Sequence, residues 1–310
     1  MTSIALDRPV TRRRAGQFQR GALVAPLLLI FFTILIFPLG LMLSSAFQKI
    51  SLSTYEVTER LTLYQFVRFF GDSYYLGLLW QTLSIAGLTT LCCLLIGYPF
   101  ALHMWRAKPG ERQVLRLIVL SPLLISFVVL NFGWLIILAP QGLINSLVLG
   151  AGFSKEPLSL LYTKGAVIVG LVHVHLPFMI LSIENALETI RPEVVRAAAS
   201  LGASPAHRFF RVILPLSVSG MVSGCLIVFA TTASAFVTPV LLGGAWVKTL
   251  ASVAYQQIMV NLDIPFGSAI SIILLLLTGI LTFTLMRLTA WLQPHLAEAS
   301  ASRGRGGGGR

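Results

Sequence analysis

Few residues in this sequence have a type and spacing that could carry out chemistry. His173 and His175 are two residues apart in an apolar segment, so on a helix their side chains point to nearly opposite sides and cannot share a metal ion. The three cysteines lie in apolar segments without a Cys-x-x-Cys pattern or a histidine at ligand spacing, which is typical of small buried residues. We therefore predict no metal site, no disulfide and no catalytic residue.

Nucleotide chemistry is not indicated either. A phosphate-binding loop needs the pattern Gly-x-x-x-x-Gly-Lys-Ser/Thr, because its backbone amides and lysine hold the phosphates. The nearest fragment, GGAWVKT at residues 243–249, lacks the glycine before Lys248. We expect that this chain does not hydrolyse ATP and that it has no cofactor of its own.

Polar side chains inside the apolar segments are the remaining candidates. A carboxylate within a membrane is by default a functional candidate. Glu184 and Glu188 lie close enough to the end of one segment to be solvated, however, and we expect a structural role for them. Deeper polar groups could line a path for a solute, or could satisfy backbone carbonyls and bridge helices. The candidates for a path are Asn131, His173, Thr232 and Ser234.

The composition indicates what kind of fold must position these residues. Of 310 residues, 56% are hydrophobic and only 11% are charged, and the mean hydropathy is +0.84. A soluble domain has about a quarter of its residues charged, so this chain cannot hide its apolar surface from water. The fold class predicted is an all-α integral membrane protein, because each lipid-exposed segment must satisfy its backbone hydrogen bonds internally.

Six stretches are long enough to cross a bilayer, which takes about 20 apolar residues. They are residues 23–43, 76–104, 114–139, 165–187, 216–240 and 267–292. The first is longer than the apolar core of a signal peptide, about 7–15 residues, so we expect an uncleaved helix. One six-span domain over 23–292 would follow a basic segment, 1–22, and precede a Gly-rich tail, 293–310, that is expected to be disordered and cytoplasmic.

The positive charge indicates the orientation of these spans. The net charge is +12, and most of the 23 Lys and Arg residues fall on the cytoplasmic side if both termini lie inside. On this reading the charge needs no nucleic-acid partner. Of the outer loops, residues 44–75 have the composition of a short amphipathic helix. Residues 241–266 are apolar enough to form a partly buried hairpin.

One polar segment lies between the fourth and fifth spans, ENALETIRPEVVRAAASLGASPAHRFFRVILPL at residues 184–216. After Pro192, small or apolar residues recur at i, i+3, i+4 and i+7, as on one face of a helix: Val194, Ala197, Ala198 and Leu201. Gly202 then suits a left-handed cap, and Ser204 with Pro205 can begin a second helix that ends near Pro215. An amphipathic basic segment at an anionic membrane surface is the alternative, and a DNA-binding helix–turn–helix is disfavoured by the adjoining spans.

The segment resembles the loop that identifies the membrane subunits of binding-protein-dependent ABC importers. The family pattern is Glu-Ala-Ala, three residues, Gly, nine residues, an aliphatic residue, any residue and Leu-Pro. The matching positions are Ala197, Ala198, Gly202, Val212, Leu214 and Pro215, whereas Arg196 stands in the Glu position. Residues 235–245 (AFVTPVLLGGA) and 255–277 (YQQIMVNLDIPFGSAISIILLLL) look like the spermidine/putrescine branch.

The resemblance implies a six-span type I permease in the bacterial inner membrane. Its partners would be a cytoplasmic ATPase dimer that binds ATP and Mg²⁺, a second permease subunit and a periplasmic binding protein. The coupling residues would be the matched positions together with Val194, Arg196 and Leu201. A stand-alone ion-coupled transporter is the alternative, although no mid-span acid supports it. Neither a nucleophile–base pair nor a metal cluster favours a membrane-embedded enzyme.

Overall fold

The computed structural model describes residues 12–50 and 57–305, with the backbone alone for 12–25, 27–29 and 288–305. Residues 1–11 of the predicted basic segment and 306–310 of the predicted tail lie outside this description. The prediction of an all-helical membrane protein is confirmed. Among the described residues, five helices are long and apolar enough to cross a membrane, and a shorter apolar helix covers Ile30–Ala46.

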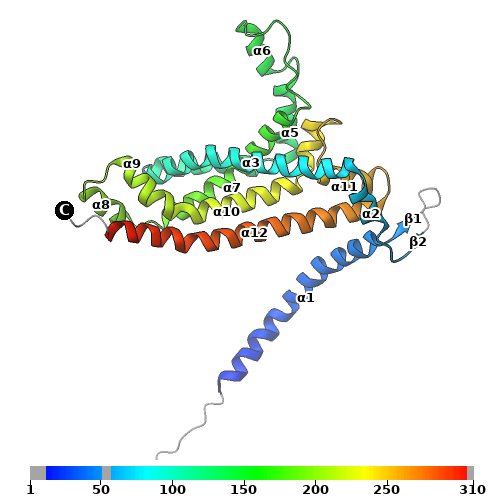
Figure 1. Cartoon of the computed structure of the whole chain (residues 1–310), viewed down its shortest axis with the longest axis horizontal. Helices are drawn as coiled ribbons and strands as arrows, with labels where there is room; N and C mark the ends of the chain where they lie inside the picture. The colour runs from blue at the N-terminus through cyan, green and yellow to red at the C-terminus, as the bar shows by residue number, and fades with distance from the viewer. Residues whose placement is uncertain (1–11, 51–56, 306–310) are drawn as a thin grey trace, which may run out of the picture.

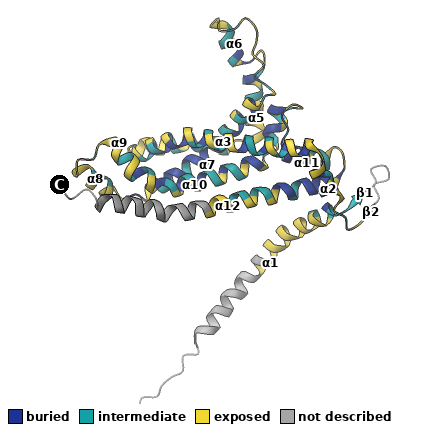
Figure 2. Cartoon of the chain, viewed as in Figure 1, coloured by how far each residue is buried: buried dark blue, intermediate teal, exposed yellow. Residues whose placement is uncertain are grey.

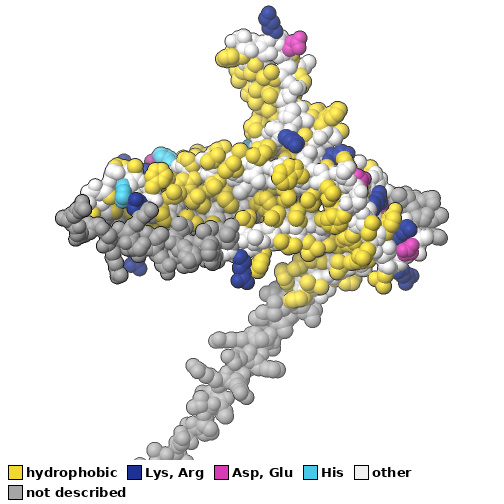
Figure 3. Space-filling view, in the orientation of Figure 1, with side chains coloured by type: hydrophobic (Ala, Val, Ile, Leu, Met, Phe, Trp, Pro, Cys, Tyr) yellow, Lys and Arg dark blue, Asp and Glu magenta, His cyan; other side chains and the backbone are white. Residues whose placement is uncertain are grey.

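Four helices run side by side and form the bundle (Figure 1): α3 (Ser73–Arg106), α7 (Lys164–Glu188), α10 (Leu214–Ser234) and α12 (Ile264–Arg305). The helix α7 is the most buried of them, and Met179 and Ile183 on it pack against Cys93 of α3 and Val228 of α10. Figure 2 places buried residues in α3, α7 and α10 and in the part of α12 that lies near α11. Hydrophobic side chains cover much of the flank of the bundle seen in Figure 3, as expected for a surface that faces lipid.

The first predicted span lies in α1 (Arg12–Ala46). This helix contacts α12 near its C-terminal end, and its N-terminal part extends obliquely away from the bundle (Figure 1). A short hairpin follows, in which β1 (Lys49–Ile50) pairs antiparallel with β2 (Val57–Glu59). The amphipathic helix expected in this loop is present as α2 (Tyr64–Gly71), which buries Gln65 and Phe69 and exposes Val67 and Phe70.

The third span predicted, residues 114–139, is wrong as a single helix. The structure forms α4 (Pro109–Leu120), a 3₁₀ turn η1 (Ser121–Leu124), α5 (Phe127–Leu138) and α6 (Leu143–Gly150). Pro122 lacks the N–H that an α-helix needs and clashes with the carbonyl four residues earlier, so the helix breaks there. The apolar span is Phe127–Gly150, and α5 and α6 project from the bundle (Figure 1).

The fifth span also ends earlier than the predicted residue 240. The helix α10 stops at Ser234, and a π-helical turn, η3 (Pro239–Gly243), follows. The backbone of Ala235 is extended, with ψ of 130°. Pro239 has no amide hydrogen to donate to the carbonyl of Ala235, so the helix is not continued by that bond. The partly buried hairpin expected after this span is confirmed, because α11 (Leu250–Met259) packs on α12 with Leu250 and Val253 buried.

The last helix is longer than the sequence indicated. Disorder was expected from residue 293, but α12 continues to Arg305. Residues 296–299 read LAEA, which are strong helix formers, so the helix can extend beyond its apolar part.

Candidate coupling segment and transport path

The polar segment between α7 and α10 has the two-helix form that its sequence predicted. The first helix, α8 (Pro192–Ser200), ends in a left-handed turn at Gly202, whose φ is +79°. The amide of Ala203 donates to the carbonyl of Ala198, which closes the turn as a Schellman-type cap. The second helix, α9 (Pro205–Arg208), begins at Ser204, whose side chain accepts from the amide of His207.

The face of α8 on which small and apolar residues were predicted to recur is turned away from the bundle. None of its residues is buried: Val194 and Ala197 are exposed, Ala198 is half-buried, and Leu201 just beyond it is 88% exposed. A fully exposed leucine beside small residues at the tip of the bundle is available to a partner surface (Figure 1). Arg196 donates to Glu193 at 3.0 Å on the exposed side of the helix, so neither charge is tied to the bundle.

The junction with the next span is a π-helical turn, η2 (Phe209–Ile213), that includes Val212. The amide of Leu214 donates to the carbonyl of Phe209, one residue farther back than in an α-helix. Pro215, in the first turn of α10, has no amide to offer the carbonyl of Arg211, so the wider turn fits the sequence locally. The segment therefore passes into α10 without a loop.

An ion cluster lies at the same end of the bundle and comprises Arg112 and Arg116 of α4 with Glu184 and Glu188 of α7. Glu184 Oε1 accepts from Arg112 Nε at 2.9 Å and from an Arg116 terminal nitrogen at 2.8 Å. Arg112 and Arg116 also both bond Glu188, the latter at 3.0 Å. Hydrogen bonding to Glu184 and its charge raise the pKa of Arg116 above its usual value.

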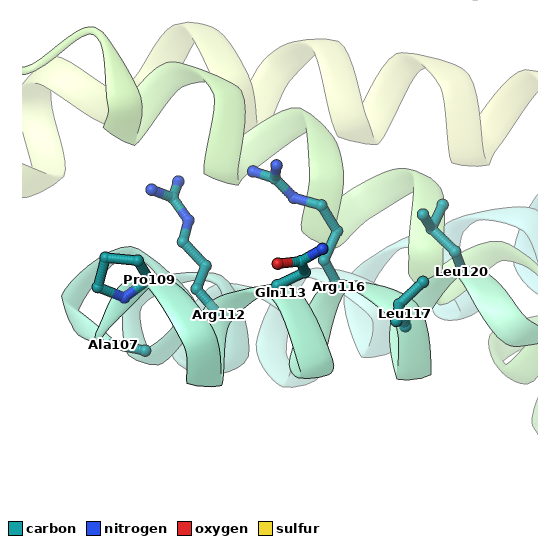
Figure 4. A pocket seen from close by; sticks show the side chains of 7 residues that line it. All are labelled: Ala107, Pro109, Arg112, Gln113, Arg116, Leu117 and Leu120. Atoms are coloured by element: carbon teal, nitrogen blue, oxygen red, sulfur yellow. The ribbon is translucent and has the colours of Figure 1, made fainter.

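Beside this cluster, α4 borders a surface cavity of about 490 Å³ that is partly lined by Arg112 and Arg116. Both arginine side chains extend from α4 in the same direction, toward the neighbouring helix (Figure 4). Their charges are already matched by two carboxylates, so this cavity offers no uncompensated positive site.

None of the four residues predicted for a path is among the residues that line the mid-bundle cavity described below. Asn131 is buried and donates to the carbonyl of Phe127 at 2.6 Å, and His173 Nδ1 accepts from Trp134 Nε1 at 2.9 Å. Thr232 is buried, whereas Ser234 is exposed and donates to the carbonyl of Ala230. For Asn131, His173 and Ser234 these are the helix-bridging and backbone-satisfying roles that the sequence left open, whereas the buried Thr232 hydroxyl has no hydrogen-bond partner among the described residues.

A mid-bundle cavity of about 380 Å³ is lined instead by neighbours of those residues. Its walls come from α5, α7, the end of α10 and the turn after it: Phe127, Val174, His175, Phe178, Thr231, Ala235, Phe236, Val237 and Thr238. A second cavity, of about 340 Å³, lies between η3 and α11 and is lined in part by Lys248, Tyr255 and Gln256. Phe236 stacks on Tyr255 with ring centroids 4.9 Å apart, so this pair stands where the two cavities approach each other.

Residues 93–298 match the family described as binding-protein-dependent transport system inner membrane component. The chain belongs to this family. It is 38% identical over 213 residues to the spermidine/putrescine transport system permease protein PotB of Haemophilus influenzae, covering 69% of this chain and 74% of that protein. PotB of Escherichia coli is 32% identical over 216 residues, covering 70% of this chain and 78% of that protein.

A crystal structure of a bacterial alginate ABC transporter, in complex with alginate pentasaccharide-bound periplasmic protein, contains a chain of the same fold. The TM-score is 0.75 over 91% of this chain and 99% of that chain, at 18% identity. The present chain is thus a multi-pass inner membrane permease, and in its family ATP is bound by a separate subunit. The prediction that this chain has no ATPase centre of its own is confirmed.

The arginines of the ion cluster are the residues of this permease that sequence reasoning missed. Arg112 and Arg116 are four residues apart, as are Glu184 and Glu188, so each pair lies on one face of its helix. This matched spacing was a readable signal. The spacing within each segment does not show, however, that the two segments meet in the fold.

Proposed function

We propose that this permease carries a polyamine such as spermidine or putrescine into the cytoplasm. The observation that carries the proposal is the 38% identity to a spermidine/putrescine permease across 69% of the chain. The two sequence regions that resemble the spermidine/putrescine branch, 235–245 and 255–277, also supply most of the lining of the second cavity: Val240, Gly244, Ala245, Tyr255, Gln256 and Val260. The likeness therefore includes residues that a solute could meet.

The exposed face of α8 is the surface we propose for docking an ATPase dimer. Val194 and Leu201 supply exposed apolar side chains, Ala197 lets a partner surface approach closely, and Gly202 sets the direction of the chain beyond them. On this proposal α8 and both termini lie in the cytoplasm, and α2 and α11 face the periplasm. A periplasmic binding protein and a second, homologous permease complete the transporter, and the related alginate transporter was itself captured with a periplasmic protein.

The mid-bundle cavity suits transient passage of an ammonium group. Phe127, Phe178 and Phe236 line it, and the face of an aromatic ring attracts a cation by about 0.5–2 kcal/mol. Neither this cavity nor the second one has a carboxylate among its lining residues, and Lys248 lines the second. We therefore assign most of the selectivity to the binding protein, and a low affinity to the permease.

Reconstitution tests the proposal directly. Proteoliposomes would contain this permease with its second permease and ATPase subunits, and the binding protein would be added outside. Radiolabelled putrescine and spermidine should enter only when ATP is inside and the binding protein is present. Uptake driven by an ion gradient without ATP would overturn the mechanism. ATP-dependent uptake of other solutes, with no polyamine uptake, would overturn the cargo alone.

A further inference from the structure

The ion cluster connects α4 to the end of α7, two helices that are far apart in the sequence. Its members are Arg112, Arg116, Glu184 and Glu188. Glu184 and Glu188 occupy the last two turns of α7, and α8 begins at Pro192, four residues after Glu188. The arginines belong to α4, which leads through η1 to α5. The cluster thus links α7, which precedes α8 in the chain, to α4, which precedes α5.

Burial of Glu184 makes the link sensitive to the loss of either arginine. The Glu184 side chain is fully buried, and its Oε2 accepts no hydrogen bond from the described residues. Both arginines therefore act on the same oxygen, Oε1. Removing one partner of a buried pair leaves charge that the interior cannot solvate, which costs far more than losing a surface pair.

The helix α4 has little else to hold it against α7. Within α4, all of which is described, Val119 is the single buried residue, while Val114, Leu117 and Ile118 are more than half exposed. Beyond α4, Phe127 in the first turn of α5 lines the mid-bundle cavity. A shift of α7 passed to α4 through the cluster would therefore reach a wall of that cavity.

We propose that the ion cluster transmits movement of α8 and the end of α7 to α4 and α5, so that its members are positioning residues for transport. This inference rests on the proposed role of α8 as the ATPase-coupling helix. The cluster touches no solute. It keeps the third membrane segment moving together with α7, although Pro122 interrupts the chain between α4 and α5.

The test uses the full transporter and measures uptake and ATP hydrolysis in the same vesicles. Arg116→Gln and Glu188→Gln change the two more exposed members, which favours folding. We expect each to lower the number of solutes moved per ATP by about tenfold while ATP hydrolysis continues. The charge-swapped double variant Arg116→Glu with Glu188→Arg should recover part of the loss, because the attraction is restored.

The pair Arg68–Asp263, 2.9 Å apart, provides the matched control at the other end of the bundle. Asp263 is buried like Glu184, but the pair joins α2 to the turn before α12. Arg68→Gln should lower thermal stability without changing solutes moved per ATP. If the cluster variants behave like Arg68→Gln, with uptake and hydrolysis falling in the same proportion, the cluster only stabilises the fold and the inference is wrong.

A readout that needs no solute separates this inference from the choice of cargo. Thr231 is exposed and lines the mid-bundle cavity, so Thr231→Cys in a background without the three native cysteines can report on it. Labelling by a thiol reagent should change when ATP is added, and Glu188→Gln should abolish that change. An ATP-dependent change that persists in Glu188→Gln would overturn the inference. A change that depends on Glu188, in a transporter that carries no polyamine, would overturn the cargo and leave the inference standing.

Discussion

The ring of Phe236 lies parallel to that of Tyr255, with an angle of 20° between their planes and 4.9 Å between their centroids. The two residues come from the chain after α10 and from α11, and each lines a different cavity. Stacked rings contribute roughly 0.5–1.5 kcal/mol beyond the area they bury, so the contact can be broken during a transport cycle. It is positioned to separate the mid-bundle cavity from the second one.

Truncation of this pair should allow solute to leak. Phe236→Ala removes one ring, so the two cavities should join and preloaded putrescine should leave vesicles several-fold faster in the absence of ATP. Efflux of labelled putrescine measures this, with inulin retention as the check on vesicle integrity. Phe153→Ala is the control, because Phe153 is 87% exposed and borders neither cavity. Equal efflux from wild type and Phe236→Ala would contradict the prediction.

Spans bounded by clear polar or capping residues could be predicted from the sequence. The fourth predicted span, 165–187, agrees with α7 to within a residue at each end, because Thr163 caps its start and polar residues follow its end. The third span could not be placed, since hydropathy stays high across Pro122 and Ser126 although the backbone turns extended at Ile125. Apolar composition reports where lipid or core can be, and it does not report where a helix breaks.

In the candidate site too, features set by neighbouring residues could be predicted from the sequence, whereas contacts between distant segments could not. The turn at Gly202 is encoded within a few residues by Gly, Ser and Pro, and its geometry was predicted. The ion cluster joins residues that are 68 to 76 positions apart, so it depends on how α4 lies against α7. The mid-bundle cavity draws on three helices and a turn, and periodicity within one helix cannot indicate which residues will meet there.

Substitution of Gly202 tests whether the turn after α8 matters for ATPase binding, and a matched glycine elsewhere controls for backbone strain in general. A side chain at φ of +79° costs about 1–2 kcal/mol, so Gly202→Ala should distort the turn after α8 and weaken binding of the ATPase several-fold. Gly152, with φ of +74°, is a matched control in the loop after α6, and at both positions an added Cβ has open space. Co-purification with the ATPase should fall for Gly202→Ala and not for Gly152→Ala. A parallel fall in both would mean that general strain explains the effect.

The charge at residue 196 should matter for the choice of ATPase. Arg196→Glu restores the residue type of the family pattern, but it places two carboxylates one turn apart, because Glu193 now pairs with the arginine at 3.0 Å. If the groove of its own ATPase complements Arg196, the substitution should weaken binding, more at low salt than at high salt, since exposed charges are screened. Titration of the ATPase at two ionic strengths measures this. Arg60→Glu, an exposed change in the loop before α2, is the control, and equal affinity for Arg196→Glu and wild type would contradict the prediction.

Close approach between α7 and α10 depends on Gly220, where the two backbones leave no room for a side chain. A Cβ there would lie 2.5 Å from Ala186 Cβ and 2.6 Å from the carbonyl oxygen of Ser182, and small residues allow such contacts between membrane helices. Gly220→Val should therefore lower the free energy of unfolding by about 1–3 kcal/mol, as overpacking does. Gly87→Val, in α3 with open space around it, should not. Thermal unfolding in one detergent compares them, and an unchanged melting temperature for Gly220→Val would show that α7 and α10 can separate without loss.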